Sequence, residues 1–268
     1  SYEVHQPYEP HEPYRELLVT DYDGELPETI GKETLDEINK GGREIDQADL
    51  DYIVSLYDGE IRSMDDGFGL LVDYLRERGF YDRTLIVFTS DHGEEFNEHG
   101  TVGWHSHTLY DELLRVPLIV KYPGNEHAGS AIAPQVRSID IPPTVVGYLG
   151  IPIPAEFFGV DLAPLVAGEA MEPLVAGSRM DRKPTRELSS IRTEEWKLAG
   201  LAKRRSLYHL PSDPAEQWDR RLKDGEVATD LAARLDALIA ELQPLEAPEV
   251  VPEGKTLQEL RNLGYLND

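Results

Sequence analysis

The feature that most constrains the fold is a short apolar run that ends in a cluster of acidic and histidine residues. Residues 84–90 read Thr-Leu-Ile-Val-Phe-Thr-Ser, and Asp91-His92-Gly93-Glu94-Glu95 follows directly. A run of this length and composition suits a β-strand that is buried on both faces, as in a parallel sheet. In α/β sheets, ligands bind beyond the carboxyl ends of the strands. We therefore expect the chemistry of this chain in the segment 91–107.

The segments around this strand predict an α/β fold. Apolar residues between Asp46 and Gly79 recur every three or four positions, which predicts an amphipathic helix that Gly79 ends at its C′ position. A second apolar strand is predicted at 116–120, and a helix at 138–149 with two prolines in its first turn. Residues 1–43 show no sustained period and are predicted to be a loop wrapped over the core.

The C-terminal third predicts a smaller unit. Residues 190–198 and 206–210 are predicted to pair as antiparallel strands, and an amphipathic helix is predicted at 226–243. A Pro- and Glu-rich linker at 244–254 precedes a last short helix. We expect three parts: the C-terminal part of a catalytic α/β domain at 1–168, a small subdomain of a hairpin and a helix at 169–245, and a linker with a terminal helix at 246–268.

Composition excludes several classes of protein. The chain has 51 acidic and 26 basic residues and a formal net charge of -25. Such a surface repels nucleic acid and anionic lipid, so we expect neither as a partner. The absence of cysteine excludes disulfides, cysteine-ligated zinc and a cysteine nucleophile within these residues. No apolar run is long enough to span a bilayer, and the oligomeric state is left open.

Four histidines fall within residues 92–107, among several carboxylates. Together these groups form the ligand set of a divalent cation, and Asp91 and His92 directly follow the buried strand. The alternative is that Asp91 caps a turn and that His92 is an ordinary loop histidine; spacing alone does not decide between them. The other polar side chains are expected to lie on a solvated face or in a turn: Glu94, Glu95, Glu98 and His99.

Several stretches, taken in chain order, resemble the sulfatase family of the alkaline phosphatase superfamily. Two of them are Ser90-Asp91-His92-Gly93-Glu94 and the run from His107 to Leu118; the specificity lies in the ordered set, since a lone Ser-Asp-His-Gly would be a weak signal. Residues 3–8, Glu-Val-His-Gln-Pro-Tyr, resemble the His-x-Pro-Tyr loop of those enzymes. The remaining similar stretches are the helix with Tyr57-Asp58 and Asp65-Asp66, Trp196-Lys197-Leu198, residues 207–216 and residues 260–265.

The resemblance implies roles for individual residues. Asp91 matches a metal-binding aspartate, and His92 matches the neighbouring position, which touches the metal or the ester oxygens. His5 matches a histidine that contacts the sulfuryl group; without the resemblance it would be predicted as a loop histidine. His107 lies near the Lys or His that assists the leaving group in the family, and His105 is its rival for that role.

The resemblance also implies a fold and an activity. The expected fold is a partial alkaline-phosphatase-like, mixed and mostly parallel sheet flanked by helices, with a small C-terminal α+β subdomain. The expected activity is metal-dependent hydrolysis of a sulfuric ester, on a small-molecule or saccharide sulfate. Calcium is the best candidate for the metal, with manganese or zinc open because histidine is an unusual calcium ligand. A periplasmic or secreted location is favoured, with the cytoplasm left open.

One part of the family pattern is missing. Sulfatases carry a Cys-x-Pro-Ser-Arg type motif whose Cys or Ser is oxidised to formylglycine, and this chain has neither form. We expect the formylglycine in an N-terminal segment that precedes these residues, and the chain alone to be inactive. Two alternatives stay open. One is a phosphoryl-transfer relative, such as a phosphodiesterase, phosphonate hydrolase or phosphoethanolamine transferase; the other is a non-catalytic, acidic metal-binding module.

Overall fold

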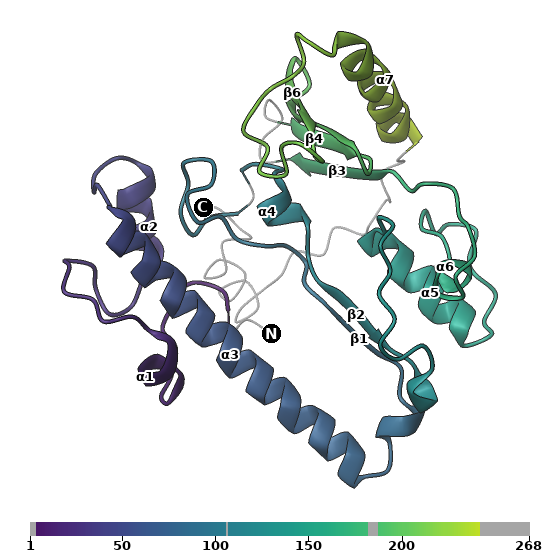
Figure 1. Cartoon of the computed structure of the whole chain (residues 1–268), viewed down its shortest axis with the longest axis horizontal. Coiled ribbons are helices and arrows are strands. Elements are labelled where there is room, and N and C mark those ends of the chain that lie inside the picture. Colours follow the sequence, from purple (N-terminus) through teal and green to yellow (C-terminus); the bar gives the residue numbers. More distant parts are fainter. Residues whose placement is uncertain (1–3, 106, 182–186, 242–268) are drawn as a thin grey trace, which may run out of the picture. The chain divides into compact units, whose positions relative to one another are not determined.

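The computed structural model describes residues 4–105, 107–181 and 187–241 (Figure 1). The chain divides into two compact units, Ser1–Leu235 and Asp236–Asp268, and the elements below belong to the first unit apart from the end of helix α7. The predicted linker and terminal helix at 246–268 lie outside the described residues. None of the helices in the described ranges combines the length and hydropathy needed to cross a bilayer.

The long helix α3 (Gln47–Glu77) begins and ends where the sequence predicts. Its N-cap Asp46 accepts a hydrogen bond from the Asp49 amide at 3.0 Å, and the Asp49 carboxylate accepts one from the Asp46 amide at 2.9 Å. This capping box satisfies two of the amides that a helix start leaves unpaired. At the other end Gly79 has a φ of +67°, and the amides of Gly79 and Phe80 donate back to the last turn, as in a Schellman motif.

The first 43 residues hold more structure than the predicted loop. They form two short helices, α1 (Tyr14–Leu18) and α2 (Lys32–Asn39). Helices of this length give no sustained apolar period, which is why the sequence pattern misses them. Tyr8 and Ile30 exchange two backbone hydrogen bonds and are both fully buried. The core that they enter is completed by Leu26, Leu35, Tyr52, Ile53, Leu56 and Val102.

The two predicted apolar strands are β1 (Ile86–Thr89) and β2 (Leu118–Lys121), which pair with each other and run antiparallel. The strand pairings within the described residues are all antiparallel, so the expected mostly parallel sheet is not seen there. Both strands are half-buried rather than buried on both faces. Their apolar character is explained by helices that contact the pair from both sides.

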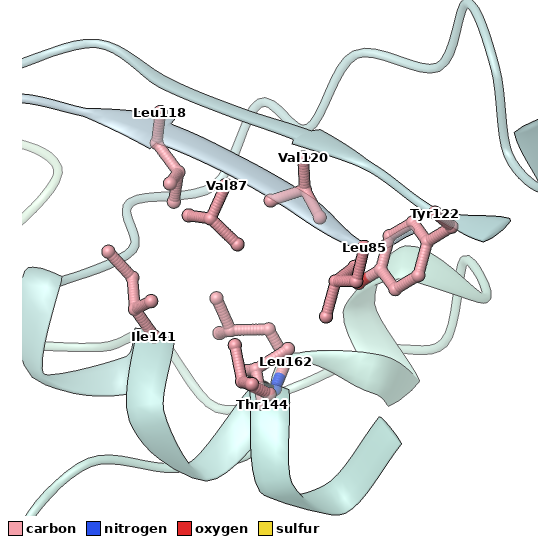
Figure 2. Close-up of a pocket in the computed structure, with 9 residues that line it drawn as sticks. Leu85, Val87, Leu118, Val120, Tyr122, Ile141, Thr144 and Leu162 are labelled. Carbon is pink, nitrogen blue, oxygen red and sulfur yellow. Dashed lines mark hydrogen bonds between the residues drawn. The ribbon is translucent and has the colours of Figure 1, made fainter. Parts of the chain in front are cut away.

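One face of the pair packs on helix α5 (Ile141–Tyr148), which carries Pro at the start of its first turn as predicted. In Figure 2 the side chains of Val87, Leu118 and Val120 point toward Ile141 and Thr144. On the other face the ring of Phe88 lies 5.4 Å from that of Phe68 in α3. This helix–sheet–helix arrangement confirms the α/β fold. The remaining short elements are η1 (Tyr81–Arg83), α4 (Asp111–Leu114), η2 (Pro123–Asn125), η3 (Ser138–Asp140) and α6 (Ala163–Val166).

The described part of the C-terminal third contains a four-stranded antiparallel sheet in the order β3-β4-β5-β6. The strand predicted at 190–198 is two strands, because a turn at 193–195 separates β4 from β5. Residues 196–198 pair with 207–209 in β6 as predicted, whereas residues 190–192 pair with β5. Helix α7 (Gly225–Glu241) follows and buries Ala228, Leu231 and Leu235. The boundary at 168 stays a prediction. The strands are β3 (Ala176–Asp181), β4 (Glu187–Arg192), β5 (Trp196–Leu201) and β6 (Arg204–His209).

Candidate active site

The backbone at the end of β1 fixes Asp91 and His92. The Ser90 hydroxyl donates to the His92 carbonyl at 2.7 Å, and the His92 amide donates to Asp91 Oδ1 at 3.1 Å. Gly93 packs so closely against the start of α4 that a Cβ there would lie 1.9 Å from the Glu112 carbonyl oxygen. The loop therefore requires glycine at this position, and the Asp91 side chain remains 76% exposed.

Three histidine rings from distant parts of the sequence meet next to this carboxylate. The rings of His92 and His105 stack with centroids 4.1 Å apart, and the ring of His5 meets His105 edge-on at 5.2 Å. His5 is oriented by its Nδ1, which lies 2.9 Å from the Gln6 carbonyl. We call Asp91, His92, His105 and His5 the histidine cluster. The structure thus brings together four of the five residues predicted for the site.

A buried carboxylate orients His105. Glu94 is 9% exposed, and its Oε1 lies 3.3 Å from His105 Nδ1. Its Oε2 accepts a hydrogen bond of 3.0 Å from the hydroxyl of Tyr8, which is fully buried. Burial, and then the charge of Glu94, raises the pKa of the Tyr8 phenol, so the phenol stays protonated and remains a donor. With Nδ1 directed at Glu94, the Nε2 atom of His105 is the one left for a ligand.

His107 is held in a different environment. Its Nε2 lies 2.7 Å from Glu95 Oε2 and 3.1 Å from the Thr101 hydroxyl, and its Nδ1 lies 3.3 Å from the His105 carbonyl. Glu95 is fully buried and also accepts a hydrogen bond from the Thr108 hydroxyl. The structure therefore places His107 as the partner of a buried carboxylate rather than in the histidine cluster.

The prediction that Glu94 and Glu95 lie on a solvated face is wrong. Both are buried, and each is paired with a histidine eleven or twelve positions further along the chain. Glu94 has a further partner, the hydroxyl of Tyr8, which lies 86 positions earlier in the chain. No helical or strand period links positions at such distances, so a local pattern could not reveal the pairs. The signal that the sequence did contain was Tyr8, the tyrosine of the His-x-Pro-Tyr stretch, which is the partner of Glu94.

Asp91 and His92 fit a metal ion as two ligands of a larger set. His92 Nδ1 lies 2.7 Å from the Gly93 carbonyl, and a carbonyl only accepts, so Nδ1 carries the proton and the Nε2 lone pair is free. This Nε2 lies 3.9 Å from Asp91 Oδ2, a spacing that permits one cation to contact both. Within the described ranges no group of three or more such donors is assembled. The two residues therefore offer a partial coordination shell.

Two family models match this chain. The sulfatase model covers residues 3–151, and the model described as N-sulphoglucosamine sulphohydrolase, C-terminal, covers residues 98–244. Among curated relatives, the multifunctional alkaline phosphatase superfamily protein PehA of Trinickia caryophylli is 35% identical over 51% of this chain and 28% of its own length. An N-acetylglucosamine-6-O-sulfatase of Bacteroides thetaiotaomicron is 34% identical over 42% of this chain and 20% of its own length.

Solved structures agree with these matches. A phosphonate monoester hydrolase of Agrobacterium radiobacter has a TM-score of 0.69 and 26% identity, over 88% of this chain and 55% of that one. A structure in complex with its substrate D-glucosamine-2-N,6-O-disulfate has a TM-score of 0.65 and 25% identity, over 75% and 44%. The chain spans less than a third of the length of the two curated relatives above. Because the sulfatase model alone matches more than half of the 268 residues, including the whole histidine cluster, this chain belongs to the sulfatase family.

Proposed function

We propose that the histidine cluster is one side of an active site that hydrolyses sulfate esters. The observation that carries the proposal is the convergence of three imidazoles, from residues 5, 92 and 105, next to an exposed carboxylate. A sulfuryl group needs its negative oxygens neutralised and its leaving oxygen protonated. An imidazolium can supply the proton, and a carboxylate with an imidazole can hold the cation that neutralises the oxygens.

Asp91 and His92 would hold a divalent cation, which would neutralise charge on the non-bridging oxygens of the ester. His5, which the family resemblance assigns to the sulfuryl group, would be the second group at those oxygens; its ring lies against His105 and its Nδ1 faces the Gln6 carbonyl. Calcium follows from the family, whereas the nitrogen ligand of His92 favours manganese or zinc. Titration with each ion separates these possibilities.

His105 is the residue that we assign to the leaving group, in preference to His107. As an imidazolium, His105 keeps its Nδ1 proton in a hydrogen bond to Glu94 and transfers its Nε2 proton to the departing alcohol oxygen as the sulfur–oxygen bond breaks, which leaves a neutral imidazole. Glu94 stabilises the imidazolium and fixes the direction of Nε2. Both ring nitrogens of His107 already face groups within the chain, so it supports the loop instead.

The assignment is tested with leaving groups of different acidity, in the polypeptide that turns over, whether these 268 residues or a longer protein that contains them. An alkyl sulfate needs a proton on its leaving oxygen, whereas 4-nitrophenyl sulfate needs little help. His105→Ala should reduce kcat on the alkyl ester by about 10²–10⁴-fold, and much less on the nitrophenyl ester. His107→Ala should reduce both equally. Equal losses for His105→Ala on the two esters would refute its role as the acid.

The 268 residues alone are expected to show no turnover. The chain has no cysteine and no Ser-x-Pro-Ser-Arg sequence from which formylglycine could be made, and its described residues provide only two metal ligands in one place. We propose that the nucleophile and the other ligands come from outside these residues. Turnover of 4-nitrophenyl sulfate by the purified chain would contradict this. A longer protein with no turnover and no metal binding would favour the non-catalytic module.

Phosphonate monoester hydrolysis is the second candidate, because the Agrobacterium radiobacter structure carries that name and matches 88% of this chain. A comparison of kcat/KM on 4-nitrophenyl sulfate and on a 4-nitrophenyl phosphonate monoester decides between the two. For the sulfate substrate we propose a small saccharide sulfate, as in the structure with D-glucosamine-2-N,6-O-disulfate. The net charge of -25 disfavours long polyanions.

A further inference from the structure

The segment 100–109, which carries His105 and His107, is held at both ends by one short stretch of the C-terminal subdomain, residues 213–217. At the N-terminal end, His99 Nε2 lies 3.2 Å from the Glu216 carbonyl oxygen, and the Gln217 side chain donates to the Glu98 carbonyl at 3.2 Å. The His99 ring also stacks on the ring of Tyr110, so the two residues that flank the segment contact each other.

The C-terminal end of the segment is held by the side chain of the same glutamate. The Asp111 amide donates to Glu216 Oε2 at 2.6 Å. Lys197 Nζ lies 2.7 Å from Asp111 Oδ1 and 2.9 Å from Glu216 Oε1, so one buried ammonium joins the two carboxylates. Arg192 contacts the other oxygen of Asp111 at 3.0 Å. Both ends of the segment thus depend on strands β4 and β5 through Glu216.

Glu216 has a backbone conformation that suits this double contact. Its φ is +52°, in the left-handed region that a non-glycine residue rarely adopts, and the residue is 2% exposed. This conformation directs the carbonyl to one end of the segment and the carboxylate to the other. The turn is fixed by Asp213, whose carboxylate accepts from the amides of Gln217 and Trp218 at 3.0 and 2.9 Å. Such a conformation persists only where the surrounding contacts enforce it.

We propose that Glu216 is a positioning residue: through its carbonyl and its carboxylate, it sets the place of the segment that carries His105 and His107. The contacts of Glu216 involve no substrate. The inference rests on the proposed function only in that the position of His105 then matters for catalysis. It assigns the C-terminal subdomain a part in the geometry of the active site. Removal of the Glu216 side chain then releases the C-terminal end of the segment at Asp111, whereas the contact of its carbonyl with His99 is kept.

The experiment uses NMR of the histidine rings and amide hydrogen exchange on the 268-residue chain. Glu216→Ala should move the ring signals of His105 and His107, because the stacking of His105 on His92 changes. It should also accelerate exchange at the amides of Val102 and Gly103 by about tenfold, relative to the core amide of Tyr8. Glu216→Gln keeps an oxygen that accepts from the Asp111 amide, and should return the ring signals toward those of the wild type.

Leu231→Ala is the matched control, because Leu231 is buried in α7 of the same subdomain and makes none of these contacts. It lowers stability but should leave both ring signals in place. Equal ring signals in Glu216→Ala and Leu231→Ala would overturn the proposal. If Glu216→Ala does not fold, His99→Ala removes the contact with the Glu216 carbonyl together with the His99 contacts to Tyr110 and Glu112, and unchanged exchange at Val102 in that variant overturns the proposal. If Glu216→Ala moves the ring signals as expected but the longer protein has no sulfatase activity, the proposed function is refuted and the positioning role of Glu216 remains supported.

Discussion

The histidine cluster and the charged group around Lys197 both concentrate ionisable side chains, but they differ in what those side chains face. We call Lys197, Asp111, Glu216 and Arg192 the Lys197 network. Lys197 is fully buried, and its ammonium lies within 3.0 Å of both carboxylates. In the histidine cluster the Asp91 carboxylate is 76% exposed, and its nearest imidazole nitrogen, His92 Nε2, is 3.9 Å away.

The difference separates a group that is complete within the chain from one that is not. The buried charges of the Lys197 network are neutralised by neighbours in this chain, so removing one member leaves another buried charge without its partner. Asp91 keeps its charge in solvent, which costs little to maintain and leaves it available for a cation. We therefore expect substitutions in the network to act first on stability, and substitutions in the cluster to act on binding.

The largest effect is expected for Lys197→Met. The substitution keeps most of the buried volume but leaves the carboxylates of Asp111 and Glu216 without their shared cation. Breaking a buried ion pair in this way costs about 3–5 kcal/mol of unfolding free energy. Urea unfolding monitored by circular dichroism measures the loss.

Lys40→Met is the matched control, since Lys40 pairs with Asp36 at 2.7 Å at the surface. The same substitution there should change the unfolding free energy by less than about 1 kcal/mol. If Lys197→Met lowers the unfolding free energy by no more than Lys40→Met does, the Lys197 network is not the stability-determining group that we infer.

A smaller, pH-dependent effect is expected at Asp111. Burial alone would raise the pKa of its carboxyl, but Lys197 and Arg192 together lower that pKa below its usual value. A carboxyl with a lowered folded pKa contributes stability that is present above its unfolded pKa, about 3.9, and is lost as pH falls through the folded pKa. Asp111→Asn should therefore be less stable than the wild type at pH 7 by about 1–3 kcal/mol.

That stability difference should shrink as pH falls below about 4, because the Asp111 carboxyl of the unfolded wild type then binds a proton that the folded carboxyl, with its lowered pKa, binds only at lower pH. Unfolding free energies of both proteins between pH 7 and pH 3 provide the measurement. A difference that stays constant over this range would mean that the charge of Asp111 is not what the network stabilises.

The two groups also differ in how far the sequence predicts them. The apolar run before Asp91 marks the end of β1 and so locates Asp91 and His92, and the motif of residues 3–8 adds His5. The caps of α3 are equally local, because Asp46 and Gly79 act within one turn of the helix ends. In these cases the physical cause lies within a few residues of its effect.

The Lys197 network was not predicted, because its members come together only in the folded chain. Asp111 contacts Glu216, which lies 105 positions further along the chain. Neither residue belongs to a periodic apolar pattern from which its burial could be predicted. The same reason explains the wrong prediction for Glu94 and the open choice between His105 and His107. Each depends on a partner that only tertiary structure selects, such as Tyr8 for Glu94.

The smallest effect on stability is expected for Asp91→Ala, which completes the comparison. Its side chain is mostly exposed, so without metal the unfolding free energy should change by no more than about 0.5 kcal/mol. In the longest available protein that contains this chain, calorimetric titration with calcium, manganese or zinc should show binding that the variant lacks. His127→Ala is the control, since His127 is an exposed imidazole outside the cluster. Metal binding that is unchanged in Asp91→Ala would place the cation elsewhere, and it would refute the proposal that the histidine cluster binds the ester oxygens through that cation.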